Sequence, residues 1–119
     1  MKILITAICT FFLVACSSTA PLTSTQDSDW GTYGLERGEK GWNFESKEQI
    51  TGLLDGKELM ASNYDAYQAG YKTGLQEYCS QDAFELGTKG GVYTGVCDGI
   101  NKEFKYEYLR GSNSTKRGM

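Results

Sequence analysis

The sequence has no histidine and only one proline among its 119 residues. Without histidine, the chain cannot form a Ser-His or Cys-His nucleophile pair, a zinc site with a histidine ligand, or an imidazole switch near neutral pH. Its formal net charge of −3 does not favour a broad basic face for nucleic acid. The length leaves room for a single domain. These absences exclude several kinds of catalytic and metal site and argue against a nucleic-acid partner.

Long apolar runs are also missing, except at the start of the chain. The 12 residues from Ile3 to Val14 are almost all apolar and follow a positive Lys2. This run is too short to span a membrane comfortably but suits the hydrophobic region of a secretory signal. It ends in Leu13-Val14-Ala15-Cys16, which resembles the bacterial lipobox, in which the cysteine receives a diacylglyceryl group. We therefore predict a lipoprotein signal peptide at residues 1–15 and lipidation of Cys16, the alternative being an ordinary signal peptide with a chance cysteine.

The predicted lipid determines where the mature protein is expected to reside. Two or more acyl chains hold a protein at a membrane almost permanently, whereas one chain does not. In the enteric lipoproteins that this signal resembles, a residue other than aspartate after the cysteine, here Ser17, directs the protein to the outer membrane. We expect residues 16–28, which are rich in Ser and Thr, to form a flexible tether on the periplasmic face. Residues 29–111 would form the globular domain, and residues 112–119 a disordered tail.

Aliphatic residues are scarce in the mature chain, so a covalent crosslink would help its small core. From Ser17 onward there are only 15 Leu, Ile, Val and Phe residues, although 13 aromatic residues are present. Once Cys9 leaves with the signal and Cys16 is lipidated, Cys79 and Cys97 are the only remaining thiols. In an oxidising envelope an even remainder favours a disulfide, with two free thiols as the alternative.

Capping residues and apolar periodicity predict a mainly helical (mainly α) domain. The predicted helices run from about Trp30 to Lys40, after the capping box of Ser46 and Gln49, through the tyrosines after residue 63, and from about residue 101 to Gly111. Their expected caps are Asp29, Ser46, Asn63 or Ser62, and Asp98 or Asn101. On the second helix, Ile50, Leu53 and Leu54 are predicted to share one buried face.

The segment between Cys79 and Cys97 is predicted to be a glycine-rich loop closed by the disulfide. Residues 80–86 are expected to form one helical turn at its start. Residues Val92–Val96 could instead form a short strand, which would make the fold α+β.

Tyrosines and glycines alternate at helical spacing in the third predicted helix. Glycine inside a helix destabilises it by about 1 kcal/mol relative to alanine, so close packing must compensate. These residues either pack helices together inside the domain, which is the preferred interpretation, or form an exposed protein-binding patch. The candidate interaction or packing residues are Tyr67, Gly70, Tyr71, Gly74, Leu75, Tyr78, Trp30 and Tyr93.

A longer pattern resembles a known family. Its centre reads Tyr67-x-x-Gly70-Tyr71-x-x-Gly74-Leu75-x-x-Tyr78-Cys79, followed by Phe84-x-x-Gly87-x-x-Gly90 and Tyr93-x-Gly95-Val96-Cys97. This pattern resembles the domain of unknown function 2799 family of small, uncharacterised lipoproteins from Gram-negative bacteria. The resemblance supports lipidation and the Cys79–Cys97 pairing but implies no activity. The chain departs from that family's pattern at Arg37, where an acidic residue is frequent.

The remaining sequence favours binding over catalysis. No two of the 15 acidic residues are singled out as an acid–base pair, and no phosphate loop or calcium loop is present. We therefore expect no enzyme activity, no cofactor, no metal and no small-molecule substrate. Three roles remain: an interaction or structural module that contacts an envelope protein, a protein that binds peptidoglycan or inhibits a lytic enzyme, and, as the least favoured alternative, a hydrolase.

Overall fold

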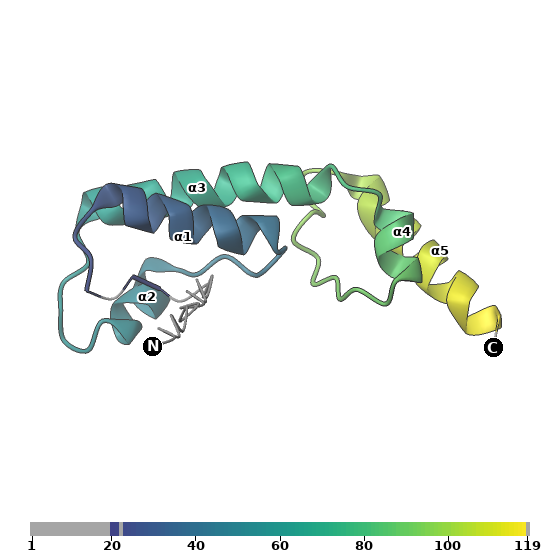
Figure 1. The fold of residues 1–119 in the computed structure, drawn as a ribbon, viewed down its shortest axis with the longest axis horizontal. Helices are drawn as coiled ribbons and strands as arrows, with labels where there is room; N and C mark the ends of the chain where they lie inside the picture. Colours follow the sequence, from purple (N-terminus) through teal and green to yellow (C-terminus); the bar gives the residue numbers. More distant parts are fainter. Residues whose placement is uncertain (1–19, 22, 119) are drawn as a thin grey trace, which may run out of the picture.

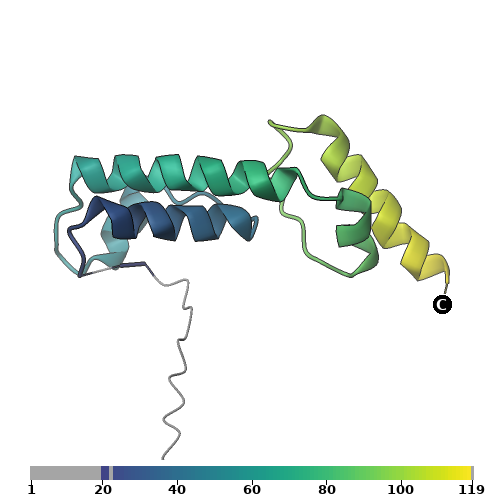
Figure 2. The same ribbon diagram turned by 45° about the horizontal axis from the view of Figure 1, so that its top comes forward.

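The computed structural model describes residues 20–21 and 23–118, so the predicted signal peptide, Cys16 and the start of the tether lie outside the described residues. The described residues form five helices, which confirms the predicted mainly helical fold. They contain no strand, so the alternative of a short strand at residues Val92–Val96 is not observed. Helix α1 lies beside α3, and α4 packs on α5 at the other end of an elongated molecule (Figure 1). Figure 2 shows the same two helix pairs joined end to end. The helices are α1 (Asp27–Glu39), α2 (Lys47–Leu53), α3 (Ala61–Cys79), α4 (Ala83–Thr88) and α5 (Lys102–Arg117).

Helix α1 begins earlier than its sequence predicts. The helix starts at Asp27 after Gln26, so the prediction that Asp29 is its cap is wrong. The carboxylate of Asp29 instead accepts a hydrogen bond from the Ser24 hydroxyl. The helix ends in a Schellman motif in which Gly41, at φ +67°, lets the chain reverse. This reversal sends the next residues back along α1.

Helices α2 and α3 show which local signals determine a helix start. The capping box is confirmed, because the Ser46 hydroxyl accepts from the Gln49 amide and the Gln49 side chain accepts from the Ser46 amide. The predicted Asn63 or Ser62 cap is wrong, because α3 already begins at Ala61. The buried Asn63 amide donates to the Thr25 carbonyl and to the Asp27 carboxylate. Asn63 therefore serves a contact between helices rather than a helix end.

The apolar face predicted for α2 is only partly correct. Ile50 and Leu54 are buried under α1 and α3 in one hydrophobic cluster, whereas Leu53 is exposed. The difference follows from the short length of α2, which ends at Leu53. The chain then turns through Asp55 and Gly56, both at positive φ, and Leu54 points to the core from this turn.

The second half of the chain differs most from its predicted boundaries. Asp82 caps α4, which lies later than the predicted turn at residues 80–86. Asn101 caps α5 through the Glu103 amide, as predicted for one of two candidates. The prediction that Gly111 ends this helix is wrong, because α5 continues to Arg117 and includes residues 112–117 of the expected tail. Gly111 lies in the helix interior. Glycine is required there because a Cβ would lie 2.1 Å from the Phe84 carbonyl oxygen of α4.

Backbone contact through glycine holds α1 against α3. A Cβ on Gly34 or Gly38 would lie 2.1 or 2.3 Å from a carbonyl oxygen of α3, and one on Gly70 or Gly74 would lie 2.1 Å from a carbonyl oxygen of α1. Four helical glycines together lower intrinsic helix stability by about 4 kcal/mol. Close approach of the two backbones returns dispersion energy, which explains why glycine occupies these positions.

The same packing occurs a second time in the chain. Gly87 and Gly111 bring α4 and α5 together as Gly38 and Gly74 bring α1 and α3 together, with a carbonyl oxygen within 2.3 Å of each hypothetical Cβ. Helix α4 also ends in a Schellman motif, with Gly90 at φ +76°. The residue numbers at these contacts rise together in both helices of a pair, so the helices run parallel (Figure 1). The α1–α3 and α4–α5 pairs are therefore two related pairs of parallel helices, which we call the first and the second helix pair.

The loops that follow the first helix of each pair are fixed by equivalent contacts. The Tyr71 hydroxyl donates to the Trp42 carbonyl at 2.7 Å, and the Tyr108 hydroxyl donates to the Gly91 carbonyl at 2.8 Å. An aromatic ring two residues further along each loop then packs on two rings of the second helix. These sets are Phe44 with Tyr67 and Tyr71, and Tyr93 with Phe104 and Tyr108.

The two helix pairs pack around separate small hydrophobic clusters, and the second cluster also contains Tyr78 and Cys79 from the end of α3. Trp30, at 1% exposure, and Tyr67 dominate the first core, and Phe104 with the two cysteines dominates the second. Within residues 20–21 and 23–118, no helix has both the length and the apolar composition required to cross a bilayer.

Candidate functional site

The residues singled out by helical spacing lie mostly inside the domain. Tyr67 has no exposed surface, and Tyr71 and Tyr78 are also buried. Gly70 and Gly74 lie in the α1 contact, and Leu75 packs against the second core. Their positions correspond to the packing interpretation of this pattern. Trp30 is buried as well, and Tyr93 packs beside Phe104.

Exposed aromatic side chains occur instead on the loop that follows α1. Trp42 is 42% exposed and Phe44 is 41% exposed, although both rings contact neighbouring side chains. Val92 is exposed on the corresponding loop of the second helix pair. The Thr94 hydroxyl links the two loops through the Asn43 side chain at 3.2 Å. We refer to residues 41–45 together with residues 92–94 as the loop surface.

Hydrogen bonds from α1 and α3 fix the backbone of the first segment of the loop surface. Besides the Tyr71 bond to the Trp42 carbonyl, Arg37 donates to the Asn43 carbonyl at 2.9 Å. The Glu45 amide donates to the Tyr67 hydroxyl at 2.8 Å. Hydrogen bonds thus tie Trp42, Asn43 and Glu45 to two buried tyrosines of α3 and to the half-buried Arg37 of α1. A loop fixed in this way loses little conformational entropy when it binds a partner.

An ion pair lies under this loop. The Arg37 guanidinium is 2.8 Å from the Glu45 carboxylate, and each side chain is 16% exposed. The Tyr33 hydroxyl donates to the same carboxylate oxygen at 2.8 Å. Among the described residues, Arg37 Nε and Glu45 Oε2 have no hydrogen-bond partner. Such a pair contributes little net stability but strongly disfavours arrangements that separate the two charges.

Two cations flank the exposed indole. The Arg37 guanidinium lies 5.2 Å from the Trp42 ring centroid, and the Lys40 ammonium lies 4.8 Å from it. Both are within cation–π range. The loop surface therefore combines an exposed indole, an exposed phenyl ring and positive charge. Helical periodicity could not identify Trp42 and Phe44 as a pair because neither residue lies in a helix. The sequence feature that could have identified them is two aromatic residues directly after Gly41, the glycine that ends α1.

The tyrosines below the loop surface resist ionisation. Burial, together with the hydrogen bond to Glu45, raises the pKa of Tyr33 to about 12. Burial also raises the pKa of Tyr67 and Tyr71. In the second helix pair, burial and the hydrogen bond to Asp98 raise the pKa of Tyr93 to about 12. All four phenols are therefore neutral donors or acceptors at physiological pH.

This shift predicts a loss of stability in alkali. The unfolded phenols titrate near 10.0, so the folded state binds more protons than the unfolded state between pH 10.0 and about 12. The stabilisation is complete below that range and should be lost as the pH rises through it. Tyr33→Phe should make the free energy of unfolding fall less steeply with pH, measured by urea denaturation. An unchanged slope in this variant would show that Tyr33 titrates normally.

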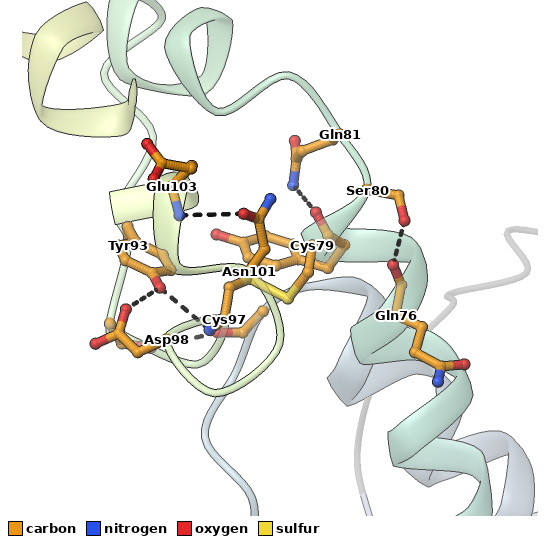
Figure 3. The surroundings of a disulfide bond; sticks show 12 residues. Gln76, Cys79, Ser80, Gln81, Tyr93, Cys97, Asp98, Asn101 and Glu103 are labelled. Atoms are coloured by element: carbon orange, nitrogen blue, oxygen red, sulfur yellow. Dashed lines mark hydrogen bonds between the residues drawn. A yellow bond between two sulfur atoms is a disulfide. The ribbon is translucent and has the colours of Figure 1, made fainter. Parts of the chain in front are cut away.

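The predicted disulfide joins the two helix pairs. Cys79 ends α3, Cys97 precedes α5, and their sulfur atoms are bonded with the Cα atoms 5.6 Å apart. Figure 3 shows the bond beside Tyr93, whose hydroxyl donates to Asp98 and accepts from the Cys97 amide. Within the part of the chain that the structure describes, no group of three or more Cys, Asp or Glu side chains could hold a metal ion.

Taken together, these features define a small helical domain of two glycine-packed pairs of parallel helices joined by a disulfide, with an aromatic loop surface. A family model described as a protein of unknown function, DUF2799, matches residues 29–113. The chain belongs to this family. No curated protein and no solved structure matches it.

Proposed function

We propose that this chain is a lipid-anchored protein of the outer membrane that faces the periplasm and acts as a binding module without catalysis. In this proposal the loop surface contacts another envelope protein. Trp42 and Phe44 offer exposed aromatic area, and tryptophan is frequent among the residues that dominate binding energy at interfaces. The buried contacts of the loop keep both rings in one arrangement before a partner binds.

One observation carries this proposal. The second helix pair has an equivalent loop without the features of the first, since Gly91 stands where the first loop has Trp42. Leu86 and Thr94 likewise stand at the positions of Arg37 and Glu45. The exposed indole and the ion pair are therefore not needed to form this type of helix pair. A requirement for binding explains their presence in the first loop.

A glycan partner is the second candidate, as peptidoglycan itself or as protection from a lytic enzyme. Sugar binding would use an aromatic face, and Trp30 is not accessible for this purpose. The face of Trp42 is already close to Arg37 and Lys40. These contacts favour a protein partner that buries the edge of the indole over a sugar ring stacked on its face.

Photocrosslinking in intact cells tests the proposed surface. A photoreactive amino acid at Trp42 should give a defined protein adduct, whereas the same group at Lys72, an exposed position on α3, should not. Trp42→Ala should also abolish co-purification of that protein while the melting temperature stays close to that of the unaltered chain. The same set of adducts from both positions would contradict the proposal, as would retention of the partner by Trp42→Ala.

The anchor is tested separately. Mass spectrometry of the mature protein should find an acylated, diacylglyceryl-modified Cys16 at its amino terminus, and Cys16→Ala should release the protein from membranes. A water-soluble product with a free thiol at Cys16 would contradict the predicted location but would leave the loop surface open to the crosslinking test.

A further inference from the structure

Charge is distributed unevenly between α5 and the rest of the chain. Helix α5 contains five basic residues and two acidic ones, which gives a net charge of +3. Residues 20–101 contain six basic and thirteen acidic residues, which gives −7. Helix α5 lies at one end of the molecule, opposite α2 and the start of α1 (Figures 1 and 2). The protein is therefore electrically polar along its length.

The basic residues of α5 share one face. At about 100° per residue, all five fall within an arc of about 140° that contains neither acidic residue of the helix. Every one of these side chains is exposed. The opposite side of the helix carries the buried Phe104 and the glycine contact with α4. The residues of this α5 cationic face are Lys102, Lys105, Arg110, Lys116 and Arg117, together with Tyr106, Leu109 and Asn113.

Apolar side chains occupy the middle of this face. Tyr106 is 62% exposed and Leu109 is 46% exposed, and both line a groove that Phe84 of α4 also lines. The Arg110 guanidinium lies 4.7 Å from the Phe84 ring centroid and pairs with Glu107 on the flank of the helix. The centre of the face can thus enter an apolar layer while the surrounding cations stay in a polar one.

We propose that the α5 cationic face docks on an anionic phospholipid surface. Basic side chains around exposed aromatic and aliphatic residues are the features by which a helix lies in a membrane interface. Lysine and arginine are attracted to the surface potential of anionic lipids, and tyrosine favours the headgroup level. The acidic remainder of the molecule is repelled by the same surface, so the two effects together orient α5 toward the lipid.

This docking is separate from the proposed binding of a protein partner. The loop surface belongs to the segments after α1 and α4, whereas the cationic face belongs to α5, and they share no residue. Lipid contact through α5 would set the orientation of the domain on the membrane. The attraction of α5 does not depend on Cys16, although an anchor there would keep the helix close to the bilayer.

Fluorescence of the full chain in vesicles tests the proposal. An environment-sensitive fluorescent amino acid is placed at Asn113, in the middle of the cationic face, or at Lys72 on α3. The protein is studied with vesicles of phosphatidylcholine alone and with vesicles that also contain phosphatidylglycerol. The probe at Asn113 should shift to shorter wavelengths and be quenched by headgroup-labelled lipids only when phosphatidylglycerol is present. High salt should reverse both changes, and the probe at Lys72 should show neither.

A pair of variants with equal net charge separates the face from the total charge. The first carries Lys105→Gln, Arg110→Gln, Lys116→Gln and Arg117→Gln, and the second carries Lys47→Gln, Lys57→Gln, Lys72→Gln and Lys89→Gln. All eight side chains are exposed, and circular dichroism checks that both variants keep their helices. The first should lose the phosphatidylglycerol-dependent quenching at Asn113, and the second should keep it. A milder variant, Arg110→Gln with Arg117→Gln, should fall between them.

Three results would overturn the proposal. The first is the same quenching at Asn113 in both kinds of vesicle, and the second is an equal loss in the two matched variants. The third is a photoreactive group at Leu109 that gives only protein adducts in cells, since this would assign the cationic face to an acidic protein. None of these results bears on whether the loop surface binds a partner.

Discussion

Gly74→Ala should lower the free energy of unfolding by about 3 kcal/mol, even though alanine favours a helix by about 1 kcal/mol. Its Cβ would lie 2.1 Å from the Leu35 carbonyl oxygen and 2.7 Å from the Glu39 amide nitrogen. Both are backbone atoms of α1, so no side-chain rotation can relieve the overlap. The helices would have to separate, and the aromatic rings that pack beneath the loop would lose contact. Urea denaturation followed by circular dichroism measures the change.

Gly52→Ala is the matched control. It lies in the short helix α2, and apart from its chain neighbours and the nearby backbone of that helix no described atom lies within 4 Å of its hypothetical Cβ. This substitution should stabilise the domain by up to about 1 kcal/mol through helix propensity. If Gly74→Ala were as stable as the unaltered protein, the close approach of α1 and α3 would be refuted. Destabilisation of both variants by the same amount would show that glycine acts here through the backbone alone.

Removal of the disulfide should have an effect of similar size. Replacing both cysteines with serine should lower the free energy of unfolding by about 3 kcal/mol, because the bond closes a loop between residues 18 apart in the sequence. Cys97 and Cys79 are also buried in the second core, so serine there adds polar groups to an apolar site. For a domain of this size, such a loss lowers the melting temperature by roughly 15 °C.

The oxidised and reduced proteins provide the comparison. Reductant should lower the melting temperature of the unaltered chain and leave that of the double serine variant unchanged. Alkylation before reduction should label neither Cys79 nor Cys97. Labelling of both thiols, or a melting temperature insensitive to reductant, would contradict a stabilising bond.

Local sequence signals were sufficient where a helix end depends on its own residues. Ser46 with Gln49, and Asn101 with Glu103, determine their helix starts through bonds within three residues. Prediction was wrong where a distant element decides. Asn63 is occupied by Thr25 and Asp27, far away in the chain, so its preference for a helix cap is overridden.

The candidate site shows the same division. Helical spacing predicted that tyrosines and glycines lie on one face of α3, and burial of Tyr67 and Tyr71 agrees with packing. Spacing could not show that the glycines face the backbone of α1, since this depends on how two helices cross. It also could not find the ion pair of Arg37 and Glu45, which only the reversal of the chain at Gly41 brings together.

The two helix pairs share one design, which makes α5 a competitor of α3 for the surface of α1 during folding. The second helices differ at one of the glycine positions that face the first helix, since Glu107 of α5 occupies the place that Gly70 has in α3. A Cβ at that place would lie 2.1 Å from the Gly31 carbonyl oxygen of α1. Helix α5 is therefore a poor substitute for α3 as the partner of α1. Glu107 thus disfavours mispairing of α5 with α1 during folding, and Glu107→Gly would remove that steric barrier.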